Sequence, residues 1–410
     1  MNRIKKFQPI ISLVLFASLF VCVQTKADVI TQWNIKARDT VVAAKLNTAV
    51  SNRALAIVHT AVYEAVNAIT KRYPSTEFKV VATNQASVDA AVAAANHKTL
   101  LALVPNQQKS IDQAYHAALG VILDGAHKDA GIKIGQEAAM FILAKRLNDN
   151  SNAVENYRPY TTAGKYVPTV IPAVPHWPNR KPWMMISPEQ FRPVPPPALK
   201  SKTWARDFNE VKMIGAKNST HRSSEQTKIA KFWQATLPPI YHGIIHSVAN
   251  ISGRNVTQNA RLFATVTRAI DDAMIAVFEA KYYYGFWRPV TAIRNADMDN
   301  NSKTKRDASW MPFIPTPMHP EYPCAHCVVA GTVGTILKAE IGDGVQPLLT
   351  TNSTTANGAM RSWASIDDFV QEVSDARIYD GVHYRTSAEV GTEMGKKIGG
   401  LAIEKYLKAK

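Results

Sequence analysis

The sequence has few cysteines. Of its three, only Cys324 and Cys327 lie beyond the N-terminal segment. No second Cys/His pair has the spacing of a structural zinc site, so such a site is not expected. In an oxidising compartment the two thiols could form a small local disulfide. The sequence leaves both the reduced and the paired state open.

Long apolar runs are absent after residue 27. Residues 264–278 come nearest, but Arg268, Asp271 and Asp272 interrupt them. This stretch therefore falls short of the roughly 20 predominantly apolar residues that span a bilayer. We predict a soluble mature chain with no stable membrane insertion.

Acidic residues are also scarce, 32 against 48 basic ones, which gives the chain a formal charge of +16. Such a charge favours anionic ligands or surfaces. The basic residues are spread along the chain, and no arginine-rich run or zinc-finger spacing gathers them. Nucleic acid is therefore not an expected partner.

The N-terminus has the three parts of a secretory signal peptide. A basic start, MNRIKK, precedes an apolar stretch over residues 9–23, and small residues Thr25 and Ala27 follow. This pattern predicts cleavage near Ala27 and an exported protein, periplasmic or extracellular. The apolar stretch is short for an uncleaved anchor, and bulky residues before Cys22 argue against acylation there. Removal of residues 1–27 would leave a charge of +12.

Helical periodicity dominates the rest of the chain, and strand signals are nearly absent. The sequence therefore predicts an all-α fold with one helical domain over residues 28–410. The expected helices cover residues 41–70, 88–103, 130–148, 201–214, 224–234, 244–252, 257–284, 326–341, 366–377 and 387–407.

Two long loops interrupt these helices. Prolines crowd residues 157–199 at a density that forbids helix interiors. Trp177 and Trp183 in this segment indicate that it packs on the protein, over the active site, rather than forming a disordered linker. A second loop rich in Pro, Asn and Asp covers residues 295–322.

The first group of candidate functional residues lies in KYYYGFWRP. Lys281 and Arg288 are seven residues apart, so the helical pattern predicts that both project from one face. Pro289 disfavours helical geometry at Arg288 and places the helix end near it. The surrounding aromatic residues indicate burial, and two buried cations on one face suggest a shared anion.

Two further segments can supply anion contacts. PCAH, residues 323–326, leads into an apolar helix whose first amides can bind an anion, and His326 falls in that first turn. In ARIYDGVHYR, Arg377 offers a planar fork suited to oxyanions. Gly381 permits close backbone approach before His383. Each histidine alone is ambiguous between a structural and a functional role.

Together these pieces resemble a known signature. K-x6-R-P, P-x-x-H and R-x3-G-x-H are similar to the motifs shared by vanadium-dependent haloperoxidases and type 2 phosphatidic acid phosphatases. HPEYPCAH, residues 319–326, resembles the haloperoxidase segment FPxYPSGH. Residues 272–294 and 53–69, with FRPVPPPALKS and IAKFW, resemble bacterial vanadium haloperoxidase homologues. The resemblance covers most of the mature chain and implies a helical bundle with long Pro-rich loops, its oxyanion site within about residues 272–390.

The resemblance also implies roles for individual residues. His383 would be the axial ligand of vanadate, or the nucleophile toward a phosphoryl group. His326 would be the general acid–base group, and His319 would tune halide and peroxide reactivity. The remaining oxyanion contacts would come from Lys281, Arg288, Cys324, Ala325, Arg377 and Gly381.

Several positions depart from the family pattern. Cys324 and Ala325 stand where the family has Ser and Gly, and a thiol is a weaker donor than a hydroxyl. A thiol beside vanadium and peroxide would also be open to oxidation. Ala376 replaces a Ser, and Ser387 replaces an Asp that would orient the nucleophilic His in a phosphatase. The loss of that Asp weighs more against phosphatase activity than against vanadate binding.

Three functional hypotheses follow. The first is a vanadate-dependent haloperoxidase that oxidises halide with hydrogen peroxide. The second is an exported acid phosphatase of the same fold, which needs no cofactor, hydrolyses phosphate esters, and uses His383 as nucleophile and His326 as acid. The third is a non-catalytic oxyanion-binding homologue. In each case the partner is a small molecule, and an oligomer is compatible with the sequence.

Overall fold

The computed structural model describes residues 28–74, 77–80 and 85–407. The predicted signal peptide and its cleavage near Ala27 lie outside the described residues. Helices dominate, as predicted from the periodicity. They are α1 (Val29–Ala43), α2 (Thr48–Thr70), α3 (Val88–Leu103), α4 (Gln108–Leu119), α5 (Ala126–Arg146), α6 (Lys202–Ile214), α7 (Ser224–Trp233), α8 (Pro239–Ala249), α9 (Val256–Tyr284), α10 (Pro289–Arg294), α11 (Ala325–Ile341), α12 (Ile366–Tyr379) and α13 (Arg385–Ala402).

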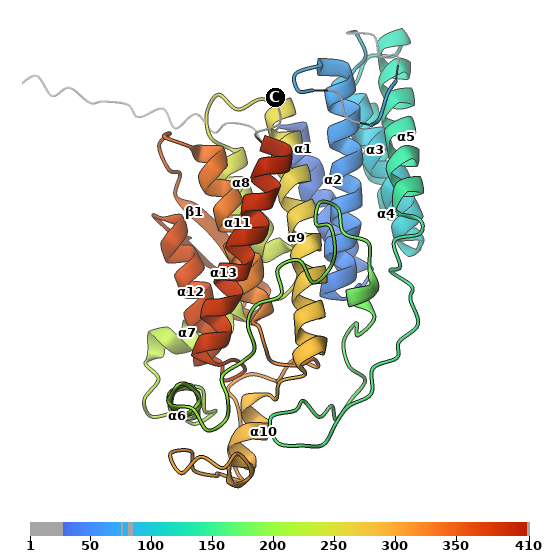
Figure 1. Ribbon diagram of the computed structural model, residues 1–410. Coiled ribbons are helices and arrows are strands. Elements are labelled where there is room, and N and C mark those ends of the chain that lie inside the picture. Colours follow the sequence, from blue (N-terminus) through green and yellow to red (C-terminus); the bar gives the residue numbers. More distant parts are fainter. Residues whose placement is uncertain (1–27, 75–76, 81–84, 408–410) are drawn as a thin grey trace, which may run out of the picture.

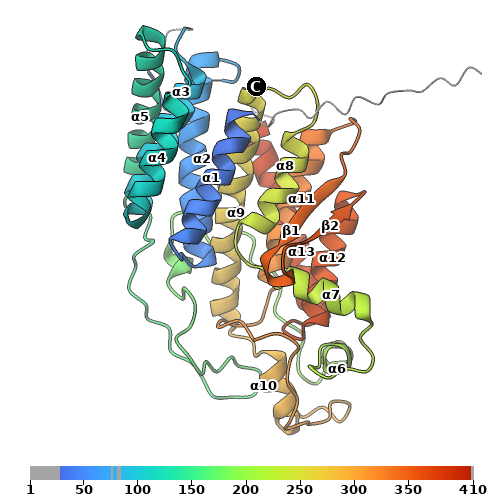
Figure 2. The ribbon, with the colours of Figure 1, turned by 180° about the vertical axis from the view of Figure 1, so that it is seen from behind.

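Helix α9 lies between the two halves of the molecule. Helices α1 to α5 pack on one side of it, and α8, α11, α12 and α13 pack on the other (Figures 1 and 2). Asn255 caps the N-terminus of α9 and forms a capping box with Gln258, and Gly285 ends the helix in the left-handed conformation. The long helix therefore brings its last turn, with Lys281, to one end of the bundle.

Close helix packing supports the half that carries the candidate site. Helices α11 and α13 contact each other extensively. A Cβ atom on Gly395 of α13 would lie 2.1 Å from the carbonyl oxygen of Val328 on α11. Glycine at this position therefore allows the two backbones to approach and fixes the start of α11 against the segment that carries His383.

The sequence missed one β-hairpin and three helices, α1, α4 and α10, and its expected helix over residues 41–70 includes only the end of α1. Strand β1 (Leu349–Ser353) pairs antiparallel with β2 (Ala359–Trp363), with Leu349 opposite Trp363. The sequences LTTNS and AMRSW lack the alternating β-branched apolar residues that signal a strand. Among the described residues, no helix combines the length and the apolar character needed to cross a membrane.

The Pro-rich segment packs on the bundle, as predicted. Trp177 is fully buried. Arg180 forms ion pairs with Asp149 and Asp271, at 2.8 and 2.6 Å. Asp272 accepts hydrogen bonds from the three consecutive amides of residues 183–185. Because carboxylates of α9 hold the segment, it forms a fixed wall of the molecule.

A cluster of two buried histidines and a half-buried one predicts acid sensitivity. His59, His242 and His246 surround the Asn34 side chain, and each has a hydrogen bond with it. Burial lowers the pKa of His59 to about 3 and that of His246 to about 4. The folded state therefore binds fewer protons than the unfolded chain below pH 6.5, the ordinary histidine value.

We expect the free energy of unfolding to fall as the pH drops from 7 to 5, by about 2 kcal/mol for each of these two histidines. Denaturant unfolding at both pH values checks this, with His59→Gln as the comparison. A wild-type protein equally stable at pH 5 and pH 7 would contradict the expectation.

Candidate oxyanion site

The last turn of α9 and the turn after it position two of the predicted cations. Lys281 is fully buried, and its Nζ donates to the carbonyl oxygens of Pro320 and Glu321, at 3.0 and 2.7 Å. Arg288 does not lie on α9, because the helix ends at Gly285 and Arg288 has an extended backbone before α10. The prediction that both residues project from one helix face was therefore wrong, although both reach the same site.

Arg288 lies at the centre of the hydrogen-bond network. Its NH1 donates to the carbonyl of Val382 at 2.9 Å and lies 3.2 Å from Nε2 of His383. Its Nε donates to the carbonyl of His319, and its NH2 lies 3.0 Å from Nδ1 of that residue. Burial lowers the pKa of Arg288 to about 10, which leaves the guanidinium charged at neutral pH.

His383 pairs with a carboxylate that the sequence reasoning did not assign. Its Nδ1 lies 2.7 Å from Oε1 of Glu321, which also accepts the amide of Tyr384 at 3.1 Å. Since Nδ1 faces an acceptor, it carries the proton, and Nε2 is left with a free electron pair toward Arg288. Burial, followed by the charges of Arg288 and Lys281, holds the pKa of His383 well below its usual value. His383 is therefore neutral, with Nε2 as its basic atom.

Arg377 supplies the third cation. It is buried in α12, its NH1 donates to the carbonyl of Trp233 at 2.6 Å, and it forms an ion pair with Asp380 at 3.0 Å. Its Nε is buried and has no hydrogen-bond partner among the described residues. A buried donor without an acceptor is costly. Arg377 therefore has hydrogen-bonding capacity to offer an anion.

The start of α11 contributes amides and a second histidine. Cys324 is the N-cap, so the amides of Ala325 and His326 fall in the first turn, where helix amides lack intrahelical acceptors. Nε2 of His326 lies 3.2 Å from the carbonyl oxygen of Ala235. Because a carbonyl only accepts, Nε2 carries the proton and Nδ1 is the basic atom. Burial, with the charge of Arg377, keeps the pKa of His326 well below its usual value.

Both cysteines are buried free thiols. Their Sγ atoms are 2.8 Å apart, and Sγ of Cys324 also accepts the amide of Cys327 at 3.4 Å. Burial opposes ionisation of Cys324, but the hydrogen bond from Cys327 and the charge of Arg377 lower its pKa. The local disulfide that the sequence left open is absent, and Cys324 lies beside the candidate oxyanion position as a polarised thiol.

The structure brings the five predicted charged or proton-handling residues together. Lys281, Arg288 and Arg377 each act electrostatically on both histidines. Gly381 has a clear packing role, because it adopts a φ of +83° and a Cβ there would lie 2.3 Å from the carbonyl oxygen of Gly215. Its expected contact with an oxyanion remains a prediction.

Two carboxylates complete the site, and the sequence reasoning assigned neither. Glu321 binds His383, and Asp380 binds Arg377. Burial raises the pKa of Glu321 and that of Asp380 to about 7. Glu321 lies inside the motif HPEYPCAH, and Asp380 lies inside ARIYDGVHYR. An acidic residue among neighbours that are expected to be buried was the sequence signal that could have identified each of them.

A cavity of about 680 Å³ opens next to this site. His319, Ala325 and His326 line it, and no Asp, Glu, Lys or Arg does. Pro172–Val174 of the Pro-rich segment form part of its wall, as expected for a segment over the active site. A ligand in the cavity therefore contacts uncharged side chains and the two half-buried histidines, His319 and His326.

Comparison with known proteins agrees with this arrangement. Residues 261–409 match a model of the second helical-bundle domain of vanadium chloroperoxidase, and this range contains the three cations, the two carboxylates and both histidines, His326 and His383. The chain is 28% identical to vanadium chloroperoxidase from Curvularia inaequalis, in an alignment that covers 69% of this chain and 59% of that protein. The chain is therefore similar to vanadium chloroperoxidase over the segment that carries the site, and its match spans 59% of that protein's length.

Solved structures of vanadium haloperoxidases share the fold. A bacterial vanadium-dependent iodoperoxidase matches with a TM-score of 0.75 and 23% identity, over 92% of this chain and 96% of that one. The holo form of a bacterial vanadium-dependent chloroperoxidase matches with a TM-score of 0.67 and 18% identity, over 89% and 93%. The all-α haloperoxidase fold predicted from the sequence is thus confirmed.

Proposed function

We propose that this protein is an exported, vanadate-dependent enzyme that oxidises halide ions with hydrogen peroxide. The arrangement around His383 carries the proposal. Its Nε2 is basic and faces Arg288, while its Nδ1 proton is held by Glu321. A basic ring nitrogen surrounded by buried cations suits bond formation to an electrophilic oxyanion centre.

The residues present fit vanadate. Three buried cations face two carboxylates, and Nε of Arg377 has no hydrogen-bond partner among the residues described. A tetrahedral oxyanion would satisfy such donors and reduce the cost of burying their charges. In this arrangement His383 would hold vanadium through Nε2, and Lys281, Arg288 and Arg377 would hold its oxygens. Bound vanadate would supply the activation of peroxide toward a halide.

The chain's own residues would control protons at this position. His326 keeps Nδ1 free, so it can accept a proton from a peroxide that enters through the cavity and return one to a departing oxygen. Lys281 is anchored by the carbonyls of Pro320 and Glu321, so its ammonium direction is fixed. The amide of Ala325 would add a hydrogen bond from the start of α11.

The cavity supports entry of a small anion. Its lining carries no charged side chain, and the buried Arg288 that contacts His319 attracts negative charge over a short distance. His319 lines the cavity and bonds Arg288, so it lies where it can tune how a halide approaches. Halide preference is therefore assigned to this end of the cavity.

One observation also favours phosphoryl transfer as a second candidate function. Ser387 stands where a phosphatase of this superfamily would carry an Asp, but Glu321 places a carboxylate oxygen 2.7 Å from Nδ1 of His383. A carboxylate in this position orients a nucleophilic histidine and stabilises the cation that forms on it. The missing Asp is thus no argument against hydrolysis of phosphate esters.

Paired assays test the two activities. Adding vanadate to the metal-free protein is expected to turn on peroxide-dependent iodination or bromination of a dye, by at least about tenfold over protein without vanadate. The same vanadate should inhibit any hydrolysis of 4-nitrophenyl phosphate, because both oxyanions need the same donors. Hydrolysis without any vanadate-dependent halogenation would replace the first proposal with the second. Vanadate binding with neither activity would leave a non-catalytic oxyanion-binding protein.

A further inference from the structure

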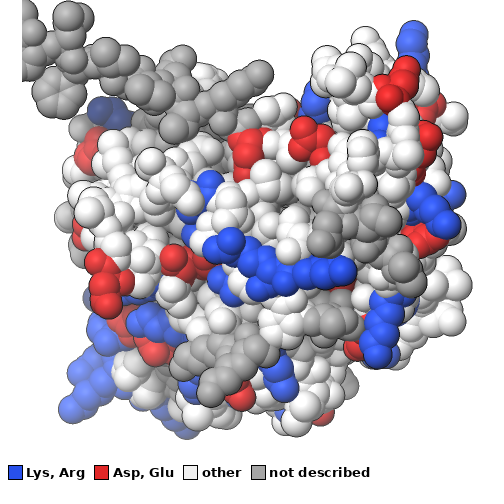
Figure 3. All heavy atoms as spheres, turned by 90° about the horizontal axis from the view of Figure 1, so that it is seen from above, with Lys and Arg blue, Asp and Glu red and all other residues white. Residues whose placement is uncertain are grey.

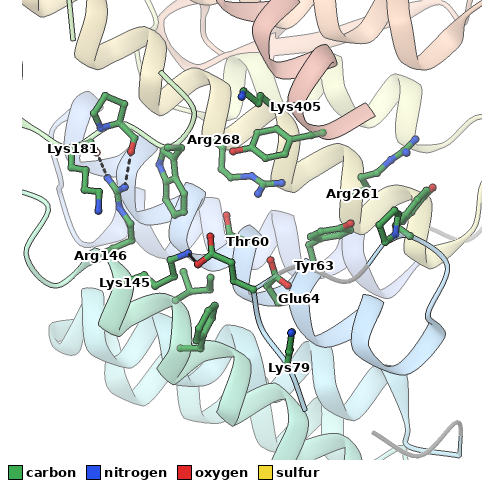
Figure 4. A pocket seen from close by; sticks show the side chains of 18 residues that line it. Thr60, Tyr63, Glu64, Lys79, Lys145, Arg146, Lys181, Arg261, Arg268 and Lys405 are labelled. Atoms are coloured by element: carbon green, nitrogen blue, oxygen red, sulfur yellow. Dashed lines mark hydrogen bonds and ion pairs between the residues drawn. The ribbon is translucent and has the colours of Figure 1, made fainter. Parts of the chain in front are cut away.

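A second, larger cavity lies away from the candidate site. Its volume is about 1030 Å³, and it shares no lining residue with the cavity beside His326. The cavity is lined by residues of α2, α5 and α9, the segment after α2, residues 181–183 of the Pro-rich segment and the π-helical turn after α13 (Figure 4). Seven basic side chains face two carboxylates, Glu64 and Glu77. The cavity is therefore strongly cationic.

Some of these cations already have partners. Lys145 pairs with Glu77 at 2.5 Å. Arg146 bonds Asp149 and the carbonyl oxygens of residues 181 and 182. Arg261 lies 3.6 Å from Glu340. These contacts hold three of the basic side chains in the cavity wall. The other four, Lys79, Lys181, Arg268 and Lys405, make the cavity positively charged.

Arg268 is the group that points to a ligand. It is 7% exposed, and its Nε donates to the carbonyl oxygen of Ala264 at 3.0 Å. No carboxylate lies within ion-pair distance of it among the described residues. Its guanidinium lies 3.7 Å from the ring centre of Tyr406, and Figure 4 shows it pointing into the cavity. The ring offsets part of the cost of burying this charge, but the terminal nitrogens of Arg268 have no hydrogen-bond acceptor among the residues that the structure describes.

Three lysines extend the positive potential. Lys79, Lys181 and Lys405 line the cavity, are exposed, and form no ion pair with another described residue. On the face of the molecule seen in Figure 3, lysine and arginine side chains form a band across the middle, with acidic side chains around it. Such a field attracts and concentrates anions.

The cavity also offers flat apolar surface. Tyr63, Phe141, Trp183 and Tyr406 contribute aromatic rings to its walls. Rings beside a planar guanidinium suit a ligand that has both an aromatic body and an oxyanion group. We propose that this cavity binds a small aryl oxyanion, a phosphate or sulfate ester, with Arg268 as the main contact for the charged group.

Calorimetry with phenyl phosphate tests this assignment. The candidate oxyanion site also attracts phosphate, so two variants separate the sites. We expect wild-type protein to bind phenyl phosphate at two sites. Arg288→Gln should retain binding in the cavity, and Arg268→Gln should retain binding only at the candidate oxyanion site. Arg158→Gln, which removes an exposed and equally charged side chain, is the control and should bind as wild type does.

The affinity of the cavity for phenyl phosphate should fall by about tenfold or more in Arg268→Gln. Arg268→Gln that binds with the stoichiometry and affinity of Arg158→Gln would overturn the proposal. If Arg268→Gln does not fold, the exposed double variant Lys181→Gln/Lys405→Gln decides, because its cavity affinity should also fall. Phenyl sulfate reports whether a sulfate ester serves as well. Inorganic phosphate bound by the cavity as tightly as phenyl phosphate would contradict the aryl assignment.

Discussion

Replacing His383 with alanine is expected to lower vanadate-dependent halide oxidation by about three orders of magnitude or more. Nε2 of His383 lies 3.2 Å from NH1 of Arg288, and the other ring nitrogen is fixed by Glu321. Alanine removes the bond-forming atom and leaves Glu321 without its partner. Activity with dye, peroxide and bromide or iodide, and vanadate retained after ultrafiltration, are the measurements.

The control for this variant is His97→Ala. His97 is a half-buried histidine of α3 that pairs with Asp112 at 2.7 Å, and it lines neither cavity. It should keep wild-type activity and vanadate retention. Circular dichroism and the thermal midpoint should show that His383→Ala remains folded. A folded His383→Ala protein with the activity of His97→Ala would refute the proposed role of His383.

The sequence predicted the site residues correctly where they belong to a motif of charged and proton-handling side chains. Lys281, Arg288, His326, Arg377 and His383 were all predicted, and the fold brings them into one buried network. The helices with strong periodicity, such as α3 and α9, were also placed within a residue or two. Local patterns determine such helices, and a three-part signature constrains how distant segments must meet.

Other features depend on contacts that no local pattern encodes. The end of α9 at Gly285 changes how Arg288 reaches the site, because a left-handed glycine stops the helix before the second cation. Glu321 precedes His383 by 62 residues, and their contact exists only after α11 packs beside α13. Ser387 was therefore read as the loss of a carboxylate, when a different segment supplies one.

Replacing Glu321 with glutamine is expected to lower both vanadate affinity and halide oxidation by about 10- to 100-fold. Glutamine keeps the volume and one acceptor oxygen, so the amide of Tyr384 can still be satisfied, but the negative charge is lost. Without that charge, Nδ1 of His383 is a poorer donor and Nε2 a weaker base toward the oxyanion centre. Activity and vanadate affinity should therefore fall together.

Measuring thermal stability beside vanadate affinity separates this role from a purely structural one, which would lower the stability of the variant. Burial raises the pKa of Glu321 to about 7, so the ionised carboxylate is costly to keep in the fold. Glu321→Gln should then be as stable as wild type toward heat while losing vanadate affinity, and Glu321→Asp should recover part of it. Glu340→Gln, which removes a buried carboxylate paired with Arg254, is the matched control and should leave vanadate affinity unchanged. Equal vanadate affinity in Glu321→Gln and Glu340→Gln would show that the carboxylate does not act through His383.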